Sequence, residues 1–136
     1  MTKFIILYFL LILRIGHISS QPAMTPFQVV QENLQFYNKR DIDRFMSSFS
    51  DSITLYNLGK SEPIAEGKEA IRNLYKGLFD DSPKLHSTIL HRAVIGNKVI
   101  DHELIKGRRG SKSPIKLVMI YEVFGGKIAR MTVVRQ

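Results

Sequence analysis

Three helical patterns followed by a long strand-like stretch constrain the fold of this chain more than any other feature. Between residues 27 and 78, apolar residues recur three times at the spacing of one helix face. After Pro83, apolar and polar residues alternate with the period of β-strands. This order predicts an α+β fold, in which three N-terminal helices pack on a curved, mostly antiparallel sheet around a cone-shaped pocket. The helical sets are Phe27, Val30, Leu34 and Tyr37; Ile42, Phe45, Met46 and Phe49; and Ile71, Leu74, Tyr75 and Leu78.

Capping and turn residues mark the ends of the predicted elements. Pro26 is suited to the first turn of the first helix, and Asp41 is suited to cap the second. Gly67 precedes the third helix, which should end before Pro83. The expected strands are 53–58, 85–95, 99–105, 115–124 and 128–135, with a loop at 59–67 and turns at Gly96-Asn97-Lys98 and Gly125-Gly126.

The first twenty residues have the layout of a secretory signal peptide. Lys3 supplies a positive start, and an unbroken apolar run of ten residues extends from Phe4 to Leu13. Arg14 ends this run, whereas a membrane-spanning helix needs about 20 apolar residues. We therefore expect cleavage after Ser20, with Ala23 as the alternative, to release residues 21–136 as a single secreted or periplasmic domain without a membrane anchor.

Composition limits the chemistry of this domain. The chain has no cysteine, which excludes thiol catalysis and zinc–thiolate sites. Its net charge is +8, but the basic residues are scattered except in the run Lys106–Lys112, a glycine-rich segment between two predicted strands. A solvated hairpin tip without interleaved aromatic residues does not resemble a nucleic-acid site. We expect no nucleic-acid partner, and the spacing of His86 and His91 gives no reason to expect a metal or cofactor.

Four short motifs connect the chain to a known family. They are Phe36–Asp43, Phe49-Ser50-Asp51, Glu66–Arg72 and Gly125–Ile128. With these motifs, residues 27–135 resemble the SnoaL-like proteins of the nuclear transport factor 2-like superfamily, in the branch related to ketosteroid isomerases. The resemblance implies a cystatin-like cone fold. It says little about activity, because this fold carries isomerases, cyclases, dehydratases and non-catalytic binders.

The resemblance also allows a test of the isomerase chemistry. Ketosteroid isomerases use an Asp base together with a Tyr and a protonated Asp that stabilise the oxyanion. The corresponding positions here are occupied by Asn57, Asn33 and Met119. Asparagine has no proton equilibrium near neutral pH, and methionine has no hydrogen to donate. We therefore do not expect ketosteroid isomerase activity.

His102 is the remaining candidate for acid–base chemistry in the pocket. It alternates with Ile100 and Leu104, so we expect these three side chains to face the cone and Asp101 and Glu103 to face away. A buried histidine in such a place is either a core residue, a ligand anchor or a catalytic group. By resemblance, the inward residues on the last two strands are Met119, Tyr121, Met131 and Arg135, with Arg135 either pairing with an anionic ligand or lying at the surface.

Three hypotheses follow from the sequence. The first is an exported domain that binds a small, mostly apolar molecule through the residues named above. The second is an isomerase, cyclase or dehydratase that uses His102 with Asn57 and Tyr121 beside a carbonyl group. The third is a homodimeric interaction module in which the open face of the sheet binds another protein.

Overall fold

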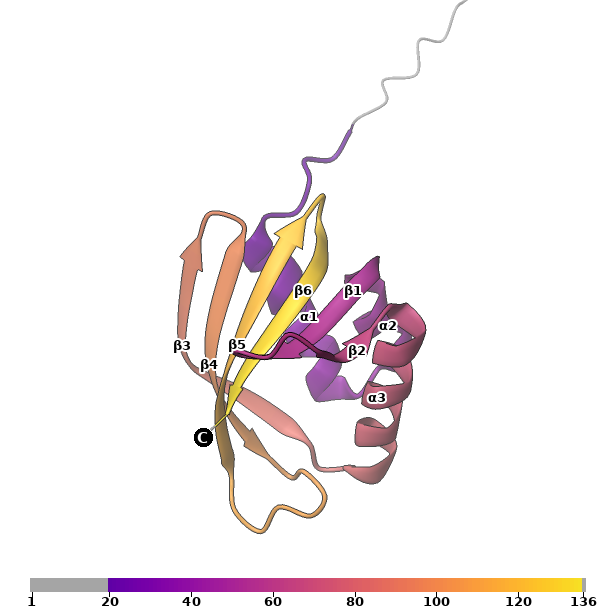
Figure 1. Ribbon diagram of the computed structural model, residues 1–136, viewed down its shortest axis with the longest axis vertical. Coiled ribbons are helices and arrows are strands. Elements are labelled where there is room, and N and C mark those ends of the chain that lie inside the picture. Colours follow the sequence, from indigo (N-terminus) through magenta and orange to yellow (C-terminus); the bar gives the residue numbers. More distant parts are fainter. Residues whose placement is uncertain (1–19, 136) are drawn as a thin grey trace, which may run out of the picture.

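The computed structural model describes residues 20–135, which form three helices packed against one curved sheet of six strands (Figure 1). The predicted α+β fold is therefore confirmed. The predicted signal peptide lies outside the described residues, except for Ser20. The helices are α1 (Pro26–Lys39), α2 (Ile42–Ser47) and α3 (Lys68–Asp81), and the strands are β1 (Phe49–Asn57), β2 (Pro63–Glu66), β3 (His86–Ile95), β4 (Lys98–Lys106), β5 (Ile115–Phe124) and β6 (Lys127–Arg135).

Local capping residues determine where the helices begin and end. Thr25 caps α1 in a capping box with Gln28, and the side chain of Asp41 accepts from the backbone N–H of Arg44 at the start of α2. α2 is shorter than predicted. It ends at Ser47, and Phe49 is the first residue of β1 and not the last of the helical stripe.

The sheet has the strand order β2-β1-β6-β5-β4-β3. β1 and β6 are parallel, and all other neighbours are antiparallel. β2 falls in the segment that was predicted as a loop, where it pairs with β1 and forms one edge of the sheet. The helices cover the concave face of this sheet, so the core lies between the two layers (Figure 1).

An aromatic cluster fills the deepest part of this core. The ring of Phe45 lies 5.0 Å from that of Phe49, 4.6 Å from that of Tyr75 and 5.4 Å from that of Phe79, measured between centroids. Leu74 was predicted to share this core, but its side chain is 44% exposed because it lies at the open end of the cone.

The prediction for the two faces of β4 is wrong by one residue. Asp101 and Glu103 are buried on the concave face, together with Val99 and Ile105, and His102 faces the opposite side. The two faces of this strand are equally apolar in sequence, since Val99 and Ile105 match Ile100 and Leu104. Alternation alone therefore did not distinguish them.

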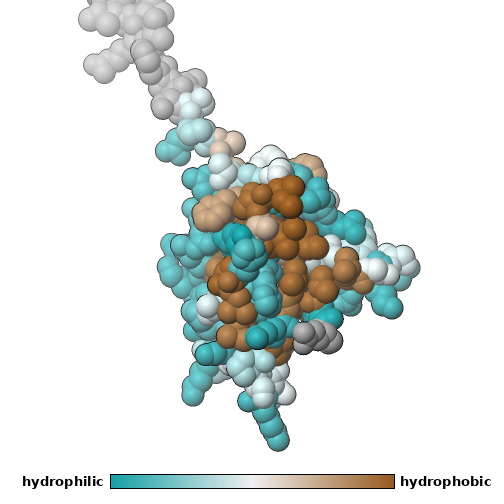
Figure 2. All heavy atoms as spheres, turned by 90° about the vertical axis from the view of Figure 1, so that its left-hand side faces the viewer, coloured by the Kyte–Doolittle hydropathy of each residue, from teal (hydrophilic) through white to brown (hydrophobic). Residues whose placement is uncertain are grey.

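The convex face of the sheet carries a hydrophobic patch. Figure 2 views the molecule from the side where β3 and β4 lie, and hydrophobic residues there surround a smaller hydrophilic area. Half-buried side chains on this face come from four strands. They are Ala93, Ile100, Leu104, Val118, Ile120 and Val134, and the more exposed Leu90 lies in a β-bulge beside them.

None of the helices among residues 20–135 is long and apolar enough to span a membrane.

Candidate ligand pocket

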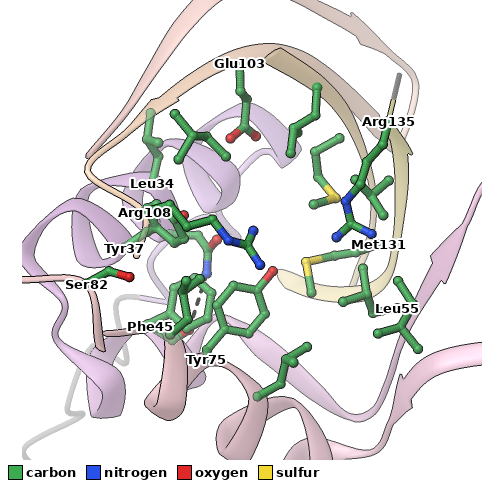
Figure 3. Close-up of a pocket in the computed structure, with 18 of the residues that line it drawn as sticks. Leu34, Tyr37, Phe45, Leu55, Tyr75, Ser82, Glu103, Arg108, Met131 and Arg135 are labelled. Carbon is green, nitrogen blue, oxygen red and sulfur yellow. Dashed lines mark hydrogen bonds between the residues drawn. The ribbon is translucent and has the colours of Figure 1, made fainter. Parts of the chain in front are cut away.

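A cavity of about 340 Å³ lies between the helices and the concave face of the sheet (Figure 3). Its volume falls at the lower end of the range usual for small-molecule sites, and its walls are mostly apolar. The lining side chains come from α1, α2, α3 and every strand except β3. The apolar and aromatic ones are Leu34, Tyr37, Phe45, Leu55, Ile64, Leu74, Tyr75, Leu78, Ile105, Leu117, Met119, Tyr121, Met131 and Val133.

Glu103 is the buried carboxyl group of this pocket. Its side chain accepts a 2.8 Å hydrogen bond from the hydroxyl of Ser87 and a 3.2 Å hydrogen bond from the hydroxyl of Tyr121. Burial raises the pKa of Glu103 to about 7, and the neighbouring charge of Asp101 adds to this effect, while both hydrogen bonds and Arg92 oppose it. The group can therefore lose or gain a proton near neutral pH.

Asp101 can be buried beside Glu103 because its carboxylate forms an ion pair with Arg92. Both carboxylate oxygens accept from the guanidinium of Arg92 at 2.6 and 2.7 Å. Arg92 also donates to Gln31 on α1 at 2.7 Å and lies over the ring of Phe27. This network ties β3, β4 and α1 together and is not part of the cavity wall, so its role is structural.

Two further hydroxyl groups face the cavity from the helices. Burial is the main cause that raises the pKa of Tyr37 and of Tyr75, and the charge of Arg108 acts in the opposite direction on both. Among residues 20–135, neither hydroxyl has a hydrogen-bond partner from the protein. Both phenols are therefore protonated at neutral pH and available to a molecule in the cavity.

The basic run between β4 and β5 is not a free hairpin tip. The backbone N–H of Arg109 donates to the hydroxyl of Ser82 at 3.0 Å, and its guanidinium pairs with Asp81 at the end of α3, also at 3.0 Å. The loop thus folds onto the segment after α3 and contributes Arg108 and Arg109 to the wall of the cavity.

Five of the seven residues predicted for the site line the cavity: Asn33, Met119, Tyr121, Met131 and Arg135. Asn33 is buried and donates from its side chain to the backbone oxygen of Phe45 at 3.3 Å. Whether any of the five contacts a ligand stays a prediction.

The structure places the other two elsewhere. His102 lies on the convex face, where it is paired with His91 of β3, so the expectation that it faces the cone is wrong. Asn57 is outside the cavity wall, although its side-chain oxygen accepts a 3.0 Å hydrogen bond from Arg135 at the mouth.

Sequence reasoning missed Glu103 and Arg108. The hairpin turn at Gly96-Asn97 contained a signal for Glu103. This turn fixes the register of β3 and β4 so that Arg92 lies directly opposite Asp101, and Glu103 shares the face of β4 that carries this pair of opposite charges. No local signal distinguished Arg108 from its neighbours. Its position depends on contacts between the loop and α3. In the part of the chain that the structure describes, no three His, Asp or Glu side chains gather as metal ligands would.

Comparison with known proteins agrees with this geometry. The SnoaL-like domain family matches residues 30–131, which is most of the chain. The chain belongs to the SnoaL-like family. No curated protein matches the sequence.

Three solved structures illustrate the likeness of this SnoaL-like domain to known folds. A cystatin-fold protein from Novosphingobium aromaticivorans is 24% identical, with a TM-score of 0.76 over 83% of this chain and 100% of that one. A nuclear transport factor 2-like protein from Cytophaga hutchinsonii is 17% identical, with a TM-score of 0.70 over 86% and 95%. An LEH-like epoxide hydrolase from M. tuberculosis is 15% identical, with a TM-score of 0.68 over 82% of each chain. At these identities the likeness concerns the fold alone.

Proposed function

We propose that this SnoaL-like domain binds a small, mostly apolar molecule in the cavity of its cone. The observation that carries the proposal is the cavity itself, which side chains leave open at about 340 Å³. Its apolar walls favour an apolar ligand by removing apolar surface from water. Glu103 and Tyr121 supply one polar anchor in these walls, since a buried carboxyl with a pKa of about 7 can donate to a carbonyl or accept from a hydroxyl.

Retention and uptake of ligand test this proposal. Native mass spectrometry of purified residues 21–136 should reveal a bound molecule, and the neutral fluorophore N-phenyl-1-naphthylamine should bind with one-to-one stoichiometry. Met131→Trp fills the cavity and should abolish uptake of the fluorophore, whereas Leu90→Trp adds the same ring outside the cavity and should leave uptake unchanged. Absence of both a retained molecule and fluorophore binding in a folded protein would refute the proposal.

A second candidate function is proton transfer beside a carbonyl group. The sequence suggested His102 for this role, but Glu103 is the titratable group in the cavity, and its pKa of about 7 suits a general base or acid. Exchange of deuterium from solvent into an apolar cyclic ketone such as 2-decalone should then be accelerated by the wild type and not by Glu103→Gln. Equal exchange rates for the two proteins would exclude proton transfer by Glu103 and would leave ligand binding as the proposed function. A ketosteroid isomerase reaction is not expected, because Asn33, Asn57 and Met119 occupy the positions of its functional groups.

We also propose that two copies associate through the convex face of the sheet. The hydrophobic patch on this face is open to solvent in a single chain, and such patches commonly mark interaction sites. Sedimentation velocity should give twice the mass of one chain for the wild type. Ile120→Glu in the middle of the patch should produce monomers, whereas Ser52→Glu on the exposed part of β1 should not. A monomeric wild type at micromolar concentration would exclude this dimer.

Export of the domain is the last part of the proposal. The positive start at Lys3 and the apolar run of ten residues support removal of residues 1–20 during secretion. N-terminal sequencing of exported protein should begin at Gln21, or at Met24 if cleavage follows Ala23. Recovery of the intact chain only in detergent extracts would indicate an anchor instead.

A further inference from the structure

The loop between β4 and β5 holds the backbone of Arg108 in a fixed position in the wall of the cavity. Gly107 has a φ of +73°, and a side chain there would overlap the carbonyl oxygen of Lys84. On the other side of Arg108, the backbone of Arg109 is bound to Ser82 and its guanidinium to Asp81. Because Gly107 lies against Lys84 and Arg109 is bound at the end of α3, the backbone of Arg108 has little freedom to turn its side chain away.

Among residues 20–135, Arg108 is the one arginine whose side chain has neither an acidic partner nor a hydrogen bond to another residue, since Arg40 donates to the backbone oxygens of Asn38 and Leu85, and Arg135 donates to Asn57. Arg108 is half-buried in the cavity wall, and no carboxylate within residues 20–135 lies at ion-pair distance from it. Asp81 in the same wall is paired with Arg109. The arginines that do pair with an Asp or Glu are Arg44, Arg72, Arg92, Arg109 and Arg130.

Two other polar groups lie near the guanidinium of Arg108. Figure 3 shows Arg108 reaching into the cavity toward Tyr75, with Arg135 on the opposite wall. The charges of Arg108 and Arg135 both lower the pKa of Tyr75 against the effect of its burial, which agrees with this proximity. The two guanidinium groups can only donate hydrogen bonds, and the phenol can donate one as well, so together they suit a ligand group that accepts several hydrogen bonds.

We propose that these three side chains bind the anionic head of the ligand, with Arg108 as its main partner. The ligand is then an apolar molecule with a single acidic group, a carboxylate or a phosphate. Its apolar body would lie against Leu55, Met131 and the other apolar walls. A guanidinium can bind either head through two parallel hydrogen bonds, and partial exclusion of water strengthens them. This inference rests on the proposed function, because it specifies the chemistry of the molecule in the same cavity.

Two fluorophores that differ only in one charged group test this inference. 8-Anilinonaphthalene-1-sulfonate carries a sulfonate, and N-phenyl-1-naphthylamine is the same molecule without it. Arg108→Gln should weaken binding of the sulfonate by about tenfold or more and leave binding of the neutral fluorophore within about twofold. Lys112→Gln removes the same charge from an exposed position of the same loop that is outside the cavity wall, and should change neither.

The outcomes separate this inference from the proposed function. If the folded wild type neither retains a molecule in native mass spectrometry nor binds the neutral fluorophore, binding of an apolar molecule is refuted. If the neutral fluorophore binds, but Arg108→Gln and Lys112→Gln weaken binding of the sulfonate fluorophore equally, the sulfonate is attracted by the net positive charge of the domain. The proposed anion site is then refuted. Equal losses for both fluorophores in Arg108→Gln would mean that Arg108 acts through packing and would also refute the site.

Competition then identifies the head group. Decanoate, decyl phosphate and decanol share one chain and differ at the end that would face Arg108. Displacement of the sulfonate by decanoate at concentrations where decanol is ineffective supports a carboxylate ligand, and the same result with decyl phosphate supports a phosphate. Displacement by decanol as effective as by both anions would overturn the anion site.

Discussion

The hydroxyl of Tyr121 on β5 donates a 3.2 Å hydrogen bond to the carboxyl group of Glu103 on β4, and both side chains are buried on the concave face of the sheet. The same carboxyl accepts from Ser87 on β3, so three adjacent strands meet at one acidic group. Burial raises the pKa of Glu103 to about 7 despite these two hydrogen bonds. This pKa makes the stability of the domain dependent on pH.

Stability should decrease between about pH 4.5 and pH 7 because of Glu103. The native state holds this proton more tightly than the unfolded chain, whose pKa is near the ordinary 4.5. The stabilisation is therefore fully present below about pH 4.5 and is lost as the pH rises toward 7. Across this pH range, Glu103 should lower the free energy of unfolding of the wild type by about 2–3 kcal/mol, and Glu103→Gln should lack this loss. Urea denaturation at several pH values measures both proteins.

A matched variant controls for other titrating groups. Glu122→Gln changes a half-exposed carboxyl on the outward side of β5 and should keep the wild-type pH dependence. Parallel curves for the wild type and Glu103→Gln would contradict the assignment of the raised pKa to Glu103.

Arg92→Met should destabilise the domain by about 3–5 kcal/mol, because it leaves the buried carboxylate of Asp101 without its cation. Arg130→Met breaks an exposed pair with Glu122 and should cost less than about 1 kcal/mol. Chemical denaturation at pH 7.5 measures both. Arg92→Met/Asp101→Leu should recover part of the loss, and a double variant less stable than Arg92→Met would argue against an uncompensated charge as the cause.

Gly107→Ala should cost more stability than Gly110→Ala. Both glycines have positive φ, so each substitution should cost about 1–2 kcal/mol from backbone strain. Only at Gly107 does the added carbon also overlap a backbone atom, the carbonyl oxygen of Lys84, whereas Gly110 has open space. Thermal and urea unfolding of the two variants provide the comparison. Equal losses would mean that the loop does not rest on the segment after α3.

Two apolar residues of α3 should respond differently to truncation. Ile71 is fully buried, and Ile71→Ala should lower the free energy of unfolding by about 2–5 kcal/mol. Leu74 is 44% exposed at the mouth of the cavity, so Leu74→Ala should cost only about 1 kcal/mol. Urea denaturation tests the pair, and a larger loss for Leu74 would place it in the core as the helical stripe first suggested.

The amino-acid sequence by itself determined the order and type of almost all elements. The helical stripes, the Asp41 cap and the glycine turns are local signals, because capping and periodicity act within one or two turns of the chain. Alternation placed Met119 and Tyr121 on one face of their strand and Met131 on one face of the next, and the family resemblance implied that these faces point inward, as the structure has them.

Only the tertiary structure decided which groups meet in the cavity. Asp101 and Glu103 are buried because Arg92, Ser87 and Tyr121 reach them from neighbouring strands, and a strand with two equally apolar faces carries no local record of such partners. Arg108 faces the cavity because Arg109 is bound to Asp81 and Ser82 at the end of α3 and Gly107 lies against Lys84, all more than twenty positions earlier in the chain. Burial of charge depends on partners brought together by folding, so spacing along the sequence does not reveal it.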